Sequence, residues 1–181
     1  MRSSIQLEIL DARVEHVDAD GLLVPVDGQL CKLGGAAAAA LRTALPEDER
    51  ADEMQYIEDE LTRLRPLRHP DAVAIDGVAR WSKLVISAAY PHNVDGAVFS
   101  ANDCARMIRA ALPVACDIAA RAGVQALGAT LIGTAYRMPA DLAIRAFVDG
   151  LAAASATLTV CWSLPDATHR DLAIGAWQRV R

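Results

Sequence analysis

DGLLVPVDGQLCKLGGAAAAAL, residues 20–41, is the stretch that decides the fold of this chain. Residues 21–26 are a continuous apolar run, which predicts a strand buried on both faces of a sheet. A polar turn at 27–29 and a glycine pair follow, and the alanine-rich segment at about 34–45 predicts a helix. A strand, a glycine loop and a helix N-terminus in this order direct free backbone N–H groups to one point, which suits a phosphate. The segment LGGA matches neither GxxxxGK[ST] nor GxGxxG, so the order of elements suggests a phosphate-binding loop and the motif does not decide it.

The composition predicts one globular domain, residues 1–181. Hydrophobic residues make up 53% of the chain and charged residues 23%. The net charge of −5 comes without a long basic stripe, which argues against nucleic acid as a partner. Glycine, Asp or Arg interrupts every apolar stretch well short of a membrane span, and MRSSIQLEIL lacks the features of a signal peptide. We therefore expect no nucleic-acid partner and no membrane partner.

The four cysteines show no paired spacing. Cys31, Cys104, Cys116 and Cys161 form no CxxC motif, and three of them lie inside apolar segments. Buried, reduced thiols are the interpretation that fits, and they are typical of a cytoplasmic protein.

Hydrophobic periodicity predicts alternating strands and helices. The expected strands are 4–10, 21–26, 71–76, 83–89, 125–132 and 157–163. The expected helices are 34–45, a segment opened by Pro46, 100–122 with a kink or break at Pro113, 139–153 and 167–180. The order β-β-α-α-β-β-α-β-α-β-α predicts a three-layer α/β/α fold with a mixed, mostly parallel sheet.

Two loops are expected to meet above the carboxyl ends of the strands, where ligands bind in open α/β sheets. The first is 27–36 and the second is 131–139. In the second loop, Gly133 offers a backbone donor, Thr134 a hydroxyl and Arg137 a cation for phosphate. Ordinary strand-to-helix turns explain the same glycines, so both interpretations stay open.

These patterns resemble the macro domain family, whose members bind ADP-ribose and related nucleotides. The family has a strand ending in VNAAN before a triple-glycine helix start, and LLVPVDGQLCKLGGAAAAAL has that layout. LVISAAYP, LIGTAYRMPADLAIRAF and SLPDATHRDL resemble later strands and loops of the family. The resemblance covers nearly the whole chain in layout and also extends to the N-terminal domain of leucyl aminopeptidases.

The family's ligand motifs are altered in the first loop. Val24 and Asp27 stand where the family has asparagines, the second of which is linked to the distal ribose and to hydrolysis. Leu33 replaces the first glycine of the triplet, so that only Gly34 and Gly35 remain. The resemblance therefore implies a degenerate pocket in which Asp27 is the candidate catalytic residue.

The other ligand positions follow the family less closely. Asp11 in LDAR takes the place of the aspartate that contacts adenine, with a gap to the next strand about two residues longer. The second loop, residues 133–138, contains less glycine than the family pattern. An adenine-stacking aromatic is missing near Pro165. The resemblance thus implies Asp11, Asp27, Gly34, Gly35, Gly133 and Thr134 as ligand-binding residues.

His16, Asp18 and Asp20 share one face if the segment is extended, which is compatible with a metal site. Exposed polar residues before a strand explain the same pattern, and we expect neither a metal nor a cofactor.

Cys31 near Asp27 lacks a neighbouring histidine, which argues against thiol catalysis. His92 and Asn93 after Pro91 fit a turn better than an acid–base role. A basic cluster is expected to be solvated loop charge and contains Arg63, Arg65, Arg68 and His69.

Two functional hypotheses remain. In the first, the chain is a macro-like domain that binds ADP-ribose or a related nucleotide in a degenerate cleft, without efficient catalysis. In the second, it is a scaffold or oligomerisation module that kept the fold and lost the pocket, so that its partner is a copy of itself or another protein. A cavity filled by Leu33, Tyr136 or Met138 would favour the second hypothesis.

Overall fold

A computed structural model describes residues 4–90, 99–134 and 138–181. The elements follow the predicted order, with one short 3-10 helix, η1 (Val14–His16), added after the first strand. The strands are β1 (Ser4–Leu10), β2 (Gly21–Asp27), β3 (Ala72–Asp76), β4 (Lys83–Tyr90), β5 (Ala126–Ala129) and β6 (Thr157–Ser163). The α-helices are α1 (Gly35–Ala44), α2 (Arg50–Arg63), α3 (Ala101–Arg121), α4 (Ala140–Ala153) and α5 (Ala167–Val180).

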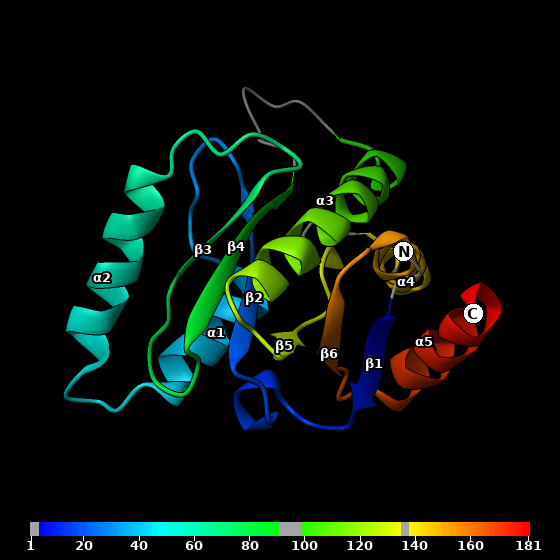
Figure 1. The fold of residues 1–181 in the computed structure, drawn as a ribbon, viewed down its shortest axis with the longest axis horizontal. Coiled ribbons are helices and arrows are strands. Elements are labelled where there is room, and N and C mark those ends of the chain that lie inside the picture. The colour runs from blue at the N-terminus through cyan, green and yellow to red at the C-terminus, as the bar shows by residue number, and fades with distance from the viewer. Residues whose placement is uncertain (1–3, 91–98, 135–137) are drawn as a thin grey trace.

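All six strands form one sheet in the order β1-β6-β5-β2-β4-β3. Every neighbouring pair is parallel except β3 with β4, which is antiparallel at the sheet edge. The predicted mixed, mostly parallel sheet is therefore confirmed. Figure 1 shows α2 and α5 at opposite ends of the molecule, beyond the two edges of the sheet.

Helices cover both faces of the sheet, which gives the three predicted layers. Leu22, Val24 and Val26 of β2 pack in one core with residues of α1 and α2. Leu23 packs on the opposite face, in a core with α3, α4 and α5. This period-two alternation explains why the whole apolar run of β2 is buried.

Helix α3 lies across one face of the sheet (Figure 1) and runs without interruption through Pro113. The predicted break does not occur. Proline lacks the N–H that would reach the carbonyl of Arg109, and Gly150 of α4 approaches α3 beside that carbonyl. A Cβ at Gly150 would lie 2.9 Å from Leu112 and 3.1 Å from the Arg109 oxygen. The missing side chain therefore allows α3 and α4 to pack closely.

Two predicted boundaries move. Strand β5 ends at Ala129 rather than at residue 132, and α2 begins at Arg50 after a turn rather than at Pro46.

The four cysteines are free and buried, as predicted. Within residues 4–90, 99–134 and 138–181, no helix combines the length and the apolar character needed to cross a bilayer.

Candidate functional site

The loop after β2 is a tight turn that hydrogen bonds of Asp27 and Gly28 hold in place. Asp27 Oδ1 accepts a hydrogen bond from the backbone N–H of Leu30 at 2.6 Å, and the Cys31 N–H donates to the Asp27 carbonyl at 2.9 Å. The Leu67 N–H donates to the Gly28 carbonyl at 2.7 Å. A Cβ at Gly28 would lie 1.7 Å from the Leu67 oxygen, so only glycine permits this approach. The close contact between Gly28 and Leu67 therefore fixes the position of the turn.

Helix α1 starts directly after this turn without a capping side chain. Gly34 is the N-cap residue, in an extended conformation, and Gly35 has φ +66°. A Cβ at either glycine would meet no atom within 4 Å. The first turn carries no acidic residue. The first N–H groups of a helix have no intrahelical partner, and the helix dipole makes that end positive, so this start favours an anion.

A cavity of about 340 Å³ opens at the α1 start. It lies at the carboxyl ends of β2, β4 and β5, and its size is within the range of small-molecule sites. Its polar residues are Asp27, Lys32, Tyr90, Thr130 and Thr134. The other lining residues are Pro25, Val26, Leu33, Gly34, Gly35, Ala36, Ala37 and Leu131. The cavity thus combines a helix N-terminus with a cation, a carboxylate and three hydroxyl groups.

A smaller cavity of about 150 Å³ lies next to the first along α1. The two share Ala36 and Thr130 in their walls, and Thr130 is 9% exposed. The remaining residues of the smaller cavity are Arg13, Val14, Glu15, Ala39, Ala40, Thr43, Ser163 and Pro165. We call the two cavities together the cleft; it runs from the β2 loop to the end of β6.

Four predicted ligand residues line the larger cavity: Asp27, Gly34, Gly35 and Thr134. Gly133 is adjacent to Thr134 but outside the lining. It has φ +107°, and a Cβ there would lie 2.3 Å from Met138 Cε. Both observations explain the glycine without a ligand.

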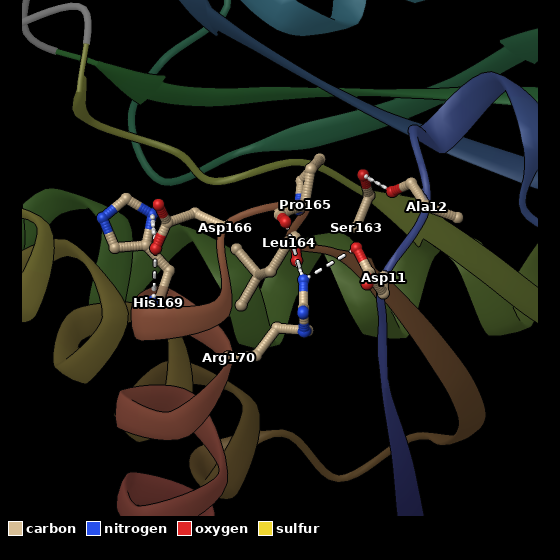
Figure 2. Close-up of polar contacts among 8 residues, drawn as sticks. All are labelled: Asp11, Ala12, Ser163, Leu164, Pro165, Asp166, His169 and Arg170. Carbon is tan, nitrogen blue, oxygen red and sulfur yellow. Dashed lines mark hydrogen bonds and ion pairs between the residues drawn. The ribbon is translucent and has the colours of Figure 1, made fainter.

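Asp11 lies outside the lining of both cavities and contacts Arg170 (Figure 2). Arg170 Nη1 donates to Asp11 Oδ1 at 2.8 Å, and also to the carbonyls of Leu164 at 2.9 Å and Pro165 at 2.7 Å. The side chain of Asp11 is 68% exposed. Asp11 therefore joins the end of β1 to the segment between β6 and α5, beside the smaller cavity.

Of the three side chains that could fill the larger cavity, Leu33 and Met138 lie in the described part of the chain, and neither closes it. Leu33 lines the cavity, and Met138 is buried in the core with α3 and α4. Tyr136, Arg137, His92 and Asn93 lie outside the described residues.

Asp20 has a structural role. Its carboxylate accepts hydrogen bonds from the N–H groups of Gln125 at 3.2 Å and Ala126 at 2.7 Å, and so fixes the start of β5. Asp18 is exposed and lies 3.9 Å from Arg80. Across the described residues, no cluster of three or more His, Cys, Asp or Glu side chains has the arrangement of a metal site. The HVDAD pattern is thus explained by strand ends and solvent.

The Cys31 thiol is buried and donates to the Gly28 carbonyl at 3.5 Å. Burial raises the pKa of this thiol, which lowers the population of the nucleophilic thiolate. In the basic cluster, Arg63 pairs with Glu60 and His69 Nδ1 lies 2.8 Å from the Ala88 carbonyl. These contacts give the cysteine and the cluster structural explanations.

Sequence reasoning missed Lys32, Thr130 and Glu15 as cleft residues. Thr130 directly follows β5, and the end of a parallel strand is a general signal for a ligand site. Our strand prediction extended beyond it to residue 132. Nothing in the sequence signals Glu15, because α1 brings that residue to the cleft only in the folded chain.

No protein-family model and no curated protein sequence matches this chain. Its fold does match solved structures. The Oceanobacillus iheyensis macrodomain with ADP has a TM-score of 0.71 and 12% identity, over 96% of this chain and 90% of that one. The Trypanosoma brucei macrodomain in complex with ADP has a TM-score of 0.67 and 12% identity, over 97% and 77%. An alphavirus P23pro-zbd structure has a TM-score of 0.68 and 10% identity, over 99% and 24%. The chain therefore has a macrodomain-like fold, as its motifs indicated.

Proposed function

We propose that this chain binds ADP-ribose or a related nucleotide in the cleft, without efficient catalysis. The carrying observation is the start of α1, where two glycines without a side-chain cap open onto a cavity of about 340 Å³. Backbone N–H groups at a helix start bind phosphate groups in many unrelated proteins. The macrodomain-like fold and the ADP-bound structural neighbours support the same ligand class.

In this proposal the diphosphate lies at Gly34 and Gly35. The Thr134 hydroxyl contacts it from the opposite loop, and Lys32 supplies a positive charge. Gly133, outside the lining, gives the loop the backbone conformation that presents Thr134. The nucleoside extends along α1 toward the smaller cavity.

Asp11 acts indirectly in this proposal. Through Arg170 it fixes the carbonyl of Pro165, and Pro165 lines the smaller cavity. Asp11 therefore shapes the nucleoside end of the cleft without contacting the base.

We also propose a cytoplasmic location, because the four cysteines are buried and free.

Asp27 would position water in any hydrolysis of an ADP-ribosyl bond. One of its carboxylate oxygens already accepts a short hydrogen bond from Leu30. A negative carboxylate beside a diphosphate also repels the ligand, which a neutral amide does not. We therefore expect turnover to be slow or absent.

Isothermal titration with ADP-ribose tests the proposal. We expect saturable heat with ADP-ribose and with ADP, and weaker binding of adenosine, which lacks the phosphates that the α1 start binds. An absence of heat at millimolar concentrations of protein and ligand would reject nucleotide binding.

A scaffold function is the alternative, and helix α5 favours it. Leu172, Ile174 and Val180 on this helix are 42%, 44% and 40% exposed. Large apolar side chains in solvent are candidates for a protein contact. Light scattering after size exclusion is the direct test, because a strictly monomeric protein would exclude self-association.

A further inference from the structure

The Glu15 side chain in η1 is largely buried, and among the described residues its carboxylate has one charged partner, Arg13, and no hydrogen-bond donor. The Glu15 side chain is only 8% exposed. The charge that faces it is Arg13 Nη1 at 3.6 Å, beyond hydrogen-bond distance, on a side chain that is 72% exposed. The backbone of Glu15 is fixed, since Arg80 Nη1 donates to its carbonyl at 2.9 Å. The carboxylate is thus held in place while its own hydrogen-bonding capacity is unused.

An ionised carboxylate can accept several hydrogen bonds, and leaving it buried without donors is unfavourable. Glu15 lines the smaller cavity of the cleft, so a ligand in that cavity can supply the donors. This cavity shares Thr130 and Ala36 with the larger one. In the proposed pose, a nucleotide whose diphosphate lies at the α1 start extends along α1 toward Glu15.

We propose that Glu15 reads the base of the bound nucleotide and selects guanine. This inference rests on the proposed function, because it takes the nucleotide site as given. Guanine presents N1–H and the exocyclic N2–H side by side, and these two donors match the two oxygens of one carboxylate.

The other bases fit the Glu15 carboxylate poorly. Adenine and cytosine each place a ring nitrogen acceptor next to the amino group, so one carboxylate oxygen would face a lone pair. Uracil offers a single N–H between two carbonyl acceptors. A site that leaves buried polar groups unpaired discriminates strongly against such ligands.

Competing titrations with GDP and ADP test the selection, because the two ligands differ only in the base. We expect GDP to bind about tenfold more tightly than ADP, as one good bidentate contact to a base implies. The variant Glu15→Gln should remove this preference. Its amide pairs with adenine N6–H and N1, and equally with guanine N1–H and O6, so neither base is favoured.

Glu47→Gln is the matched control, because Glu47 is exposed, lies outside both cavities and changes the net charge equally. It should keep the wild-type preference. Equal affinities of the wild type for GDP and ADP, or an unchanged preference in folded Glu15→Gln, would overturn the inference while nucleotide binding stands. A protein that binds neither GDP, ADP nor ADP-ribose would overturn both proposals together.

Discussion

Helices α1 and α3 begin in opposite ways. At the start of α3, Ser100 Oγ accepts from the Asp103 N–H at 3.1 Å, and Asp103 Oδ2 accepts from the Ser100 N–H at 3.3 Å. This reciprocal capping box satisfies helix N–H groups with the chain's own side chains. At the start of α1, Gly34 and Gly35 offer no side chain at all. The start of α3 is thus capped by its own side chains, whereas the start of α1 has no side-chain cap.

The remaining helices sharpen this contrast. Helix α5 is capped by Asp166, whose Oδ1 accepts from the His169 N–H at 2.9 Å. Helices α2 and α4 lack a side-chain cap but carry acidic residues in their first turns. Among the described α-helices, α1 alone has neither a cap nor an acidic residue at its start. Its N-terminus is therefore the most favourable of the five for a bound phosphate.

Among these variants, Gly28→Ala should destabilise the protein most, through the loop that precedes α1. The new Cβ would lie 1.7 Å from the Leu67 oxygen, so the loop beneath the α1 start must move. We expect the free energy of unfolding to fall by about 3 kcal/mol, measured by chemical denaturation. Gly34→Ala is the control, since its Cβ meets open space, and it should cost less than about 1 kcal/mol. Equal losses of unfolding free energy in both variants would contradict the inference that the Gly28–Leu67 contact fixes the turn.

Gly34→Asp should convert α1 into a helix of the α3 type. The extended conformation of Gly34 suits an N-cap aspartate, and that carboxylate would occupy the helix N–H groups in place of a phosphate. Repulsion between two charges at close range implies about 100-fold weaker binding of ADP-ribose by titration. Stability should stay constant or rise by a few tenths of a kcal/mol. Unchanged affinity would mean that the phosphates do not bind at α1.

Ser100→Ala should affect only the α3 side. Losing this cap costs about 1 kcal/mol of unfolding free energy, because the Asp103 N–H loses its acceptor. Affinity for ADP-ribose should not change, since neither residue lines the cleft. Denaturation and titration of the same sample separate the two effects. A parallel loss of binding would show that the two helix starts are coupled.

Acid should weaken the capped helices selectively. Hydrogen bonds from Ser100 lower the pKa of Asp103, and the hydrogen bond from the His169 N–H lowers the pKa of Asp166. A lowered pKa in the folded state stabilises the protein above the unfolded pKa, and this stabilisation is lost as the pH falls below about 4. The difference in Tm between wild type and Ser100→Ala should therefore shrink between about pH 7 and about pH 3. A constant difference would contradict a role for the Asp103 charge.

Local signals were sufficient for most of the secondary structure. The apolar run of β2, the alanines of α1 and the polar start of α3 each give one element its conformation, because neighbouring residues control those choices. The weaker predictions fail where chain neighbours do not decide. Pro113 does not break α3, whose uninterrupted course is supported by close packing on α4. Strand β5 ends early because the chain leaves the sheet to form a wall of the cleft.

The candidate site was predicted only in part for the same reason. Asp27, Gly34 and Gly35 were expected together because the strand–loop–helix order is local, and all three line the larger cavity. Asp11 was also expected to contact the ligand, and its hydrogen bond with Arg170, 159 residues away, is a contact that no sequence pattern reports. Glu15 was missed for the converse reason, since its burial depends on elements that pack against η1.

By itself, the sequence determined the order of the elements, the three-layer class of the fold and the glycine start of α1, because these depend on periodicity and on local backbone freedom. Only the tertiary structure decided the strand order, the pairing of Asp11 with Arg170 and the burial of the Glu15 side chain. Contacts between distant segments determine which polar groups are satisfied and which remain available to a ligand. In this protein the side-chain caps of α3 and α5 stabilise the fold, whereas the uncapped start of α1 and the Glu15 side chain line the two cavities of the cleft.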